Sequence, residues 1–486
     1  MPGLAVRTGR RPSGAARGGG FGIPPRRTVI AVGAGLLLAA AAGPLVTRSA
    51  AAAAAVAVAL ILGAILAYIR GRPMGEVVII LMILISGLVD IPQRIHMGPT
   101  TGQGAETVGL LGIMLLVILS GYLGSGVPQM SRMWPIALFV LWTYLSFSWG
   151  GYPKQGLQNI FVYTGFFGAL VIAATVGRWQ QDGGYKAMDW AFRIAAGLGL
   201  GLYGIGYAVG GHGTRVVLAP RPFGLFGVLI IAWFASGDRI GLWWAKYVVV
   251  ATVLLTVLSL SRSALAAQLA VIVLARFDPR YVRSWMRTAA IVVGAAVVAL
   301  VAVFEYAPLH HRFFHGDVHS STFFGFTLNV TGRDALWSAN WGWFLQKPLI
   351  GWGAGSSDTL TAALPGHNAG HPHNDYLRLL VDYGVVGLAL WLVGFFIVLR
   401  LTWKAWQSVR NSRTPAEHVH SAAFLGLVGI ALCMIVDNPL IEIVKMGPLG
   451  AMVGLSMGIA AAAAASRPAY PISAPAAPVP EPAASP

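Results

Sequence analysis

The chain has 486 residues, of which 56% are hydrophobic and only 10% are charged. A soluble domain averages about 25% charged residues, so the composition argues against a soluble protein and favours one that lies mostly in a lipid bilayer. The formal net charge of +17 would suggest a nucleic-acid partner for a soluble protein. In a membrane protein it reflects topology instead, because Lys and Arg accumulate on the cytoplasmic side, and we expect no nucleic acid to bind.

Residues 1–27 form a basic, Gly-rich tail that lacks the layout of a signal peptide. Behind it the sequence predicts an all-α, polytopic integral membrane protein, because apolar stretches of about 20 residues, long enough to cross a bilayer, recur along it. We predict about fourteen spans, with twelve as the alternative: about eleven within residues 28–304 and three within residues 379–466. They start near Thr28, Ala50, Glu76, Thr107, Met133, Gln158, Ala191, Pro222, Gly241, Ser263, Thr288, Gly384, Val419 and Gly447.

The distribution of basic residues predicts the orientation of these spans. If the N-terminus lies in the cytoplasm, the cytoplasmic segments hold 23 of the 34 Lys and Arg residues, which agrees with the positive-inside rule. An even number of spans then returns the C-terminus to the cytoplasm, where residues 467–486 form a Pro/Ala-rich tail that we expect to be disordered. The one long polar loop, residues 305–378, faces the outside, which is the periplasm in a bacterial inner membrane.

Three of the basic residues on the predicted outer side matter most: Arg215, Arg221 in "RPFGLFG" and Arg262 in "LSLSRSALAA". An arginine at the rim of a membrane can simply extend to lipid headgroups. Positive charge on the outer side runs against the topological bias, however, and a guanidinium offers a planar fork of donors that suits phosphate oxygens. We therefore expect these arginines to bind a pyrophosphate at the membrane surface.

The long loop ends in "HPHND", which runs directly into an apolar stretch. A histidine beside a hydroxyl can act as a general base, and the alternative is a loop histidine bonded to backbone. The concentration of polar groups at the start of a span favours catalysis. We predict His373 as the base and His371 as a weaker contributor, with Asn374 and Asp375 orienting the ring or the substrate.

A metal site is the competing interpretation of the histidines, because zinc uses His and carboxylate ligands. The sequence contains no HExxH motif and no pair of cysteines, since Cys433 stands alone, so we predict neither a metal nor a cofactor. The candidate ligands are His310, His311, His315, His319, His367, His371, His373 and Asp375.

Two further segments of the loop have alternative interpretations. "GWGAGSSD", residues Gly351–Asp358, resembles a phosphate-binding loop but lacks its Gly-Lys-Ser/Thr ending, so we interpret it as a tight turn that brings backbone close to other groups. The aromatic residues of "ALWSANWGWFLQ" could form a wall that stacks on sugars or an anchor at the membrane interface, where Trp is enriched; the residues are Trp337, Trp341, Trp343 and Phe344.

Four segments, in this order, resemble motifs of the O-antigen ligase and polymerase family of membrane enzymes. They are "RPFG" at Arg221, "SRSA" around Arg262, "TGRDALWSANWGWFLQKPLIGWGAG" with Arg333, and "HPHNDYLRLLVDYGVVG". The resemblance covers about residues 220–392; before that the chain is similar to the family only in its hydrophobic spans. The ligases usually have about twelve spans.

The resemblance implies a glycosyltransferase of the inner membrane that needs no cofactor. Its donor would be a glycan on undecaprenyl pyrophosphate, and its acceptor either lipid A core, for a ligase, or a growing O-antigen or exopolysaccharide chain, for a polymerase. It implies a supporting role for Arg333. The alternative is a transporter or flippase of lipid-linked glycans, which would carry charged residues near the middle of its spans. The predicted spans have almost none there, so we favour surface chemistry.

Overall fold

The computed structural model describes seven continuous ranges, residues 67–88, 132–151, 153–211, 215–237, 241–277, 333–364 and 370–466, together with short pieces between them. The chain divides into two compact units, Met1–Pro73 and Met74–Pro486. The second unit holds the helices and strands whose bounds are given below. The predicted spans near Thr28, Ala50, Thr107 and Thr288 lie outside the described residues, apart from isolated positions.

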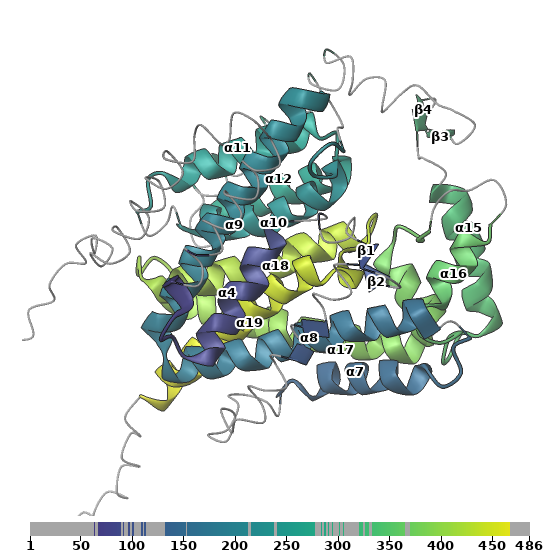
Figure 1. Cartoon of the computed structure of the whole chain (residues 1–486), viewed down its shortest axis with the longest axis horizontal. Coiled ribbons are helices and arrows are strands. Elements are labelled where there is room, and N and C mark those ends of the chain that lie inside the picture. The colour runs from purple at the N-terminus through teal and green to yellow at the C-terminus, as the bar shows by residue number, and fades with distance from the viewer. Residues whose placement is uncertain are drawn as a thin grey trace, which may run out of the picture. The chain divides into compact units, whose positions relative to one another are not determined.

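The described part is helical, with two short hairpins (Figure 1). The helices are α4 Met74–Ser86, α7 Trp134–Ser146, α8 Pro153–Trp179, α9 Gln181–Gly210, α10 Pro220–Gly237, α11 Ala245–Leu258, α12 Arg262–Arg276, α15 Arg333–Gln346, α16 Ser356–Ala362, α17 Asp375–Val409, α18 Pro415–Met434, the 3-10 turn η3 Pro439–Ile441 and α19 Ile443–Ala465. The strands form two antiparallel pairs, β1 His96–Met97 with β2 Thr100–Thr101 and β3 Ser320–Phe323 with β4 Phe326–Asn329.

Six of the described helices, α8, α9, α10, α17, α18 and α19, are long and apolar enough to cross a membrane. Helices α4, α7 and α11 are apolar but shorter. The part of the chain that the structure describes is therefore helical, as predicted, and its multiple apolar helices indicate an integral membrane protein. The six long helices coincide with spans predicted from the sequence. The total of about fourteen spans stays a prediction.

Helices α8 and α19 pack closely because small residues recur on α19. Gly450, Gly454 and Gly458 stand four residues apart, so they share one face of the helix. A Cβ atom at Gly454 would lie only 2.1 Å from the backbone oxygen of Leu170 on α8. Small residues at such a spacing let helix backbones approach within a membrane, and the two helices run side by side in Figure 1.

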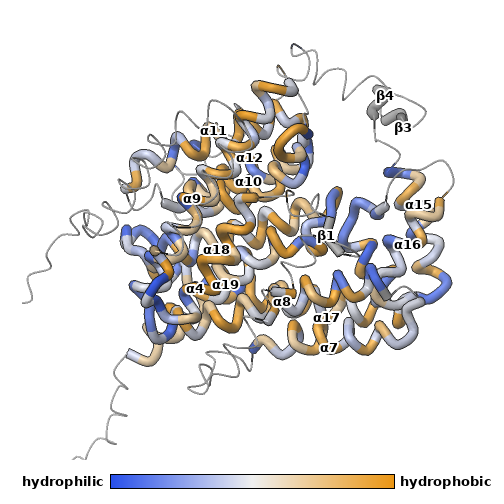
Figure 2. The backbone as a smooth tube through the Cα atoms, viewed as in Figure 1, coloured by the Kyte–Doolittle hydropathy of each residue, from blue (hydrophilic) through white to orange (hydrophobic). Residues whose placement is uncertain are grey.

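Helix α17 is bent at Gly384, where φ is 66° and ψ is −170°. Glycine tolerates this backbone conformation because it has no Cβ. The bend interrupts the helical hydrogen bonds, and the freed N–H groups of Val385 and Val386 donate to the carbonyl oxygens of Pro348 (2.8 Å) and Leu349 (3.3 Å). The bend thus separates a polar first part, Asp375–Tyr383, from an apolar second part that matches the span predicted near Gly384. Figure 2 shows hydrophobic residues along α7 and α17.

Candidate active site

One cavity collects charged and hydroxyl side chains from four separate parts of the chain. Its lining residues are Pro220, Arg221, Ser259, Leu260, Ser261, Arg262, Ser263, Arg333 and Asp437. They meet because α10 begins beside the turn between α11 and α12: a Cβ atom at Gly224 would lie 3.0 Å from the hydroxyl of Ser261. The first residue of α15 and the loop after α18 complete the cavity.

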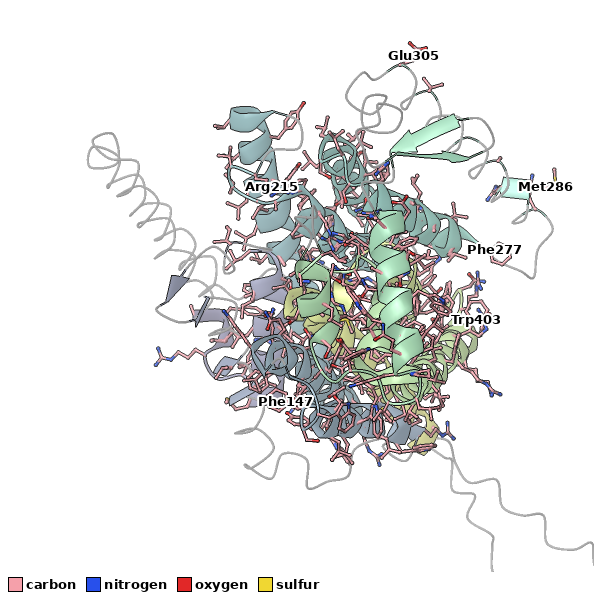
Figure 3. The ribbon with its side chains drawn as sticks, turned by 90° about the vertical axis from the view of Figure 1, so that its right-hand side faces the viewer. Phe147, Arg215, Phe277, Met286, Glu305 and Trp403 are labelled. Carbon is pink, nitrogen blue, oxygen red and sulfur yellow. The ribbon has the colours of Figure 1, made fainter. Side chains whose placement is uncertain are left out.

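Three arginines therefore line a single cavity: Arg221, Arg262 and Arg333. The first two were predicted as a pair from the sequence, and Arg333 as a supporting residue. Arg215, labelled in Figure 3, is exposed and is not among the residues that line this cavity. Converging guanidinium groups create a strongly positive site, which suits a phosphate or pyrophosphate group.

The carboxylate of Asp437 holds Arg221 in place. Oδ1 of Asp437 accepts from both Nε and Nη2 of Arg221, and Oδ2 accepts from the hydroxyl of Ser263 at 3.1 Å. Asp437 is buried, whereas the Arg221 side chain remains 34% exposed. The pair thus fixes one edge of the guanidinium while part of the group still faces the cavity.

His373 occupies the turn that precedes α17, with a left-handed φ of 52° that is unusual for a residue with a side chain. Trp337 of α15 donates from Nε1 to the carbonyl of Pro372 at 2.9 Å, which ties this turn to α15. The ring nitrogen Nδ1 of His373 lies 3.5 Å from the side-chain nitrogen of Asn438. We call the turn that carries His371 and His373 the histidine turn. It is thus in contact with the loop after α18.

The electrostatics of His373 connect it with the arginine cavity. Burial lowers its pKa most, the positive charges of Arg221 and Arg333 lower it further, and Asp437 opposes them, so the pKa falls from 6.5 to about 3. His371 also lowers this pKa. The imidazole of His373 is therefore neutral at physiological pH and can accept a proton.

A second cluster, built around the fully buried Arg378, holds the histidine turn in place. Asp358 of α16 hydrogen-bonds Nδ1 of His371 at 2.9 Å and Nη1 of Arg378 at 2.6 Å. Nε of Arg378 also donates to Asp375 at 3.1 Å, and Asp375 accepts from the backbone N–H of Leu440 at 2.8 Å. This chain of contacts joins α16, the start of α17 and the loop after α18.

The charge state of Asp358 follows from these partners. Burial alone would raise its pKa, but the charge of Arg378 and the hydrogen bond with His371 outweigh burial and lower the pKa to about 2. Asp358 is therefore ionised, and it balances the buried Arg378.

Asn374 and Asp375 face groups other than the imidazole of His373. The side-chain oxygen of Asn374 accepts from the N–H of Leu377 at 3.0 Å and caps α17, while the Asp375 carboxylate faces Arg378 and Leu440. Of the predicted tight turn Gly351–Asp358, the turn itself covers residues 351–355, and the last three residues begin α16. φ is 101° at Gly353, and a Cβ atom there would lie 2.4 Å from the Cα of Gly150, so the expected close backbone approach is present.

The aromatic residues of α15 have different environments. Trp337 supports the histidine turn, Phe344 is buried, and Trp341 is exposed. Trp343 accepts through its carbonyl oxygen from Nε1 of Trp352 at 2.8 Å. Within the part of the chain that the structure describes, no three His, Cys, Asp or Glu side chains are grouped as metal ligands. The candidate ligands His310, His311, His315, His319 and His367 lie outside the described residues.

Residues 247–392 match the family model described as O-antigen ligase. The chain contains an O-antigen ligase domain. The matched range includes Arg262, Arg333, His371 and His373, whereas Arg221 and Asp437 lie outside it. No curated protein matches the chain. The O-antigen ligase domain makes the chain an enzyme of the glycosyltransferase type, and the family acts on lipid-linked glycans.

Proposed function

We propose that this O-antigen ligase domain protein transfers a glycan from undecaprenyl pyrophosphate to an acceptor hydroxyl without a metal ion. The acceptor is lipid A core or a growing O-antigen or exopolysaccharide chain. The observation that carries the proposal is the single cavity lined by Arg221, Arg262 and Arg333. Next to burial, the charges of Arg221 and Arg333 lower the pKa of the neighbouring His373.

The arginines hold the pyrophosphate of the donor. Its negative charge increases when the bond to the sugar breaks, and groups that are already oriented toward that charge stabilise the transition state most. Asp437 fixes Arg221, so the guanidinium group of Arg221 does not need to reorganise during the reaction. Arg215, which the sequence analysis also expected to bind pyrophosphate, is exposed and is not among the residues that line this cavity, so the proposal does not depend on it.

The transfer step forms one bond and breaks one bond. The acceptor oxygen attacks the anomeric carbon while the bond from that carbon to the pyrophosphate oxygen breaks, and undecaprenyl pyrophosphate leaves with the electron pair. His373 takes the proton of the acceptor hydroxyl and then releases it to solvent. His371, held by Asp358, supports the turn that carries this base.

Donor binding also adjusts the strength of the base. A pKa of about 3 makes the free imidazole a weak base, and a general base works best with a pKa near the working pH. Since Arg221 and Arg333 lower this pKa, a bound pyrophosphate that neutralises them raises it. His373 therefore becomes a stronger base when the donor is in place.

We place the site at the periplasmic face of the bacterial inner membrane, with both termini in the cytoplasm. The excess of basic residues in the predicted cytoplasmic segments supports this orientation. Undecaprenyl pyrophosphate carries glycans at that face, and the long loop that contains the histidines falls on the same side.

The decisive experiment is transfer in vitro by purified His373→Ala enzyme with a lipid-linked donor and an acceptor. General base catalysis contributes about 10²–10⁴-fold in rate, so transfer should fall by that order while donor binding stays nearly intact. His371→Ala is the matched control, with a smaller loss. Full transfer by His373→Ala would eliminate the base, and loss of wild-type activity in EDTA that zinc restores would establish a metal mechanism instead.

A further inference from the structure

The end of α15 and the turn after it expose large apolar side chains. Leu345 is 58% exposed and Leu349 is 68% exposed, and Trp341 and Ile350 are exposed as well. We call these four residues the α15 tip. Single exposed leucines are common on proteins. These four residues, however, fall within the ten positions 341–350, at the end of α15 and just after it. Together they form an apolar surface that suits an apolar partner.

The α15 tip is docked on α17 at the point where its apolar part begins. The carbonyl oxygens of Pro348 and Leu349 accept from the N–H groups of Val385 and Val386, which Gly384 leaves without helical partners. A Cβ atom at Gly384 would lie 2.2 Å from the Leu349 oxygen, so the two segments touch through their backbones. These contacts fix the depth of the tip relative to the membrane-spanning part of α17.

The α15 tip is also continuous with the surface that α17 presents to lipid. Val385, Val386, Val393 and Phe396 of α17 are large apolar residues that the chain leaves exposed, as expected for the lipid-facing side of a span. The tip therefore lies next to an apolar surface whose partner is the bilayer.

We propose that the α15 tip enters the hydrocarbon edge of the bilayer, in the leaflet on the side of the active site, and that its partner is phospholipid acyl chains. Lys347 fits this position: it is exposed, and its ammonium group lies 4.1 Å from the ring centroid of Trp352. A lysine and tryptophans at the boundary between hydrocarbon and headgroups are characteristic of membrane interfaces.

This insertion sets the height of the active site. The first part of α17, Asp375–Tyr383, rises from the tip to the histidine turn, and at 1.5 Å per residue it is about 13 Å long. The headgroup layer on each side of a bilayer is about 5–8 Å thick. The tip thus holds His373 just above the headgroups, where the pyrophosphate of a membrane-bound molecule can reach the cavity.

The test measures the depth of single nitroxide labels by their collisions with oxygen, which concentrates in lipid, and with a nickel chelate, which stays in water. The full chain with Cys433→Ala receives one new cysteine, Leu349→Cys or Leu345→Cys, and is reconstituted at one copy per phospholipid nanodisc. Val393→Cys on α17 is the lipid-exposed control. Ala335→Cys is the water-exposed control, because it lies on the same helix about 15 Å from Leu345.

We expect the labels at Leu349 and Leu345 to collide with oxygen several-fold more than with nickel, as at Val393, and the label at Ala335 to show the reverse. Nickel access at Leu349 equal to that at Ala335 would overturn the proposal. Protection from both reagents would overturn it too, because protein would then cover the tip. Both tip residues are exposed, so either label serves if the other variant does not insert.

Discussion

Two arginine–aspartate clusters interact with the histidine turn, one through His371 and one through His373, and they differ in their access to solvent. Arg378 is fully buried, with Asp358 on one side and Asp375 on the other. Arg221 contacts the buried Asp437, but its own side chain is 34% exposed and lines a cavity. We call Arg378 with Asp358 and Asp375 the sealed cluster, because solvent does not reach the arginine, and we call Arg221 with Asp437 the open cluster, because its arginine faces a cavity.

This difference in solvent access gives the two clusters different roles, one structural and one in ligand binding. A sealed arginine can only hold the segments that its partners belong to, and its removal leaves buried charges uncompensated. An open arginine that is already oriented can add an anionic ligand to its contacts. The sealed cluster therefore fixes the shape of the site, and the open cluster meets the substrate.

The largest expected effect comes from breaking the sealed cluster. Arg378→Ala should lower the free energy of unfolding by about 3–5 kcal/mol, because it leaves the buried carboxylates of Asp358 and Asp375 without their cation. Thermal unfolding in nanodiscs measures the loss. Arg400→Ala, an exposed arginine on the same helix, is the control and should change stability little. An Arg378→Ala protein as stable as this control would show that the cluster is not structural.

Arg221→Ala should mainly abolish transfer. Removal of one oriented donor to a developing charge typically costs about 10²–10³-fold in rate, and Arg221→Lys should restore activity only in part, because a point charge lacks the fork. The assay is transfer in vitro. Arg215→Ala tests the assignment from sequence: because Arg215 is exposed and is not among the residues that line the cavity, we expect nearly normal transfer. Equal losses in the two Ala variants would contradict the special position of Arg221.

Only some of the residues that line the arginine cavity could be predicted from the sequence. Arg221, Arg262 and Arg333 stand out because they are basic residues on the predicted outer side and match motifs of a known family. Asp437 has no such motif, and it lies in a short loop between two apolar stretches. The available signal was its charge, since the whole chain has only 17 acidic residues, but the sequence does not say which arginine it meets.

In the sealed cluster, Asp375 was predicted as a site residue, but Arg378 and its contact with Asp358 were missed for a different reason. Arg378 and Asp358 are twenty positions apart in a loop without periodicity, and only the turn at Gly353 and the start of α17 bring them together. The helices themselves follow from apolar length, so the spans at α8, α10 and α19 could be predicted. The bend at Gly384 could not, because it depends on the carbonyl groups of a distant segment, Pro348 and Leu349.

A milder change sharpens the comparison within the open cluster. Asp437→Asn keeps one oxygen for Arg221 and can donate from its NH2 group to the hydroxyl of Ser263, but it removes the charge that attracts the guanidinium. A hydrogen bond to a charged group contributes about 1.5–3 kcal/mol. The variant keeps the hydrogen bond and loses only the part of this energy that comes from its charge, so we expect transfer to fall by roughly tenfold, with a higher KM for the glycan donor. A loss as large as that of Arg221→Ala would mean that Asp437 has a direct role in the chemistry.

The smallest expected effect is the contribution of His373 to the dependence of stability on pH. The pKa of His373 is about 3 in the folded protein and 6.5 in the unfolded chain, so the unfolded chain binds the proton more strongly. Stability is then lost as the pH falls below about 6.5, by at most about 0.7 kcal/mol between pH 7 and pH 6. In the sealed cluster, Asp358, with a pKa of about 2, contributes only at lower pH. Burial raises the pKa of Asp375 to about 7, so this carboxyl binds its proton more strongly in the folded protein and acts with the opposite sign to His373 between pH 6 and pH 7.

The difference in unfolding free energy between wild type and His373→Gln isolates this histidine, because every other group titrates equally in both proteins. We expect the wild type to lose more stability than the variant from pH 7 to pH 6. Inorganic pyrophosphate should shrink this difference, since an anion beside Arg221 and Arg333 offsets the charges that lower the pKa of His373. If pyrophosphate binds and the difference does not change, the arginines and the histidine do not share one site.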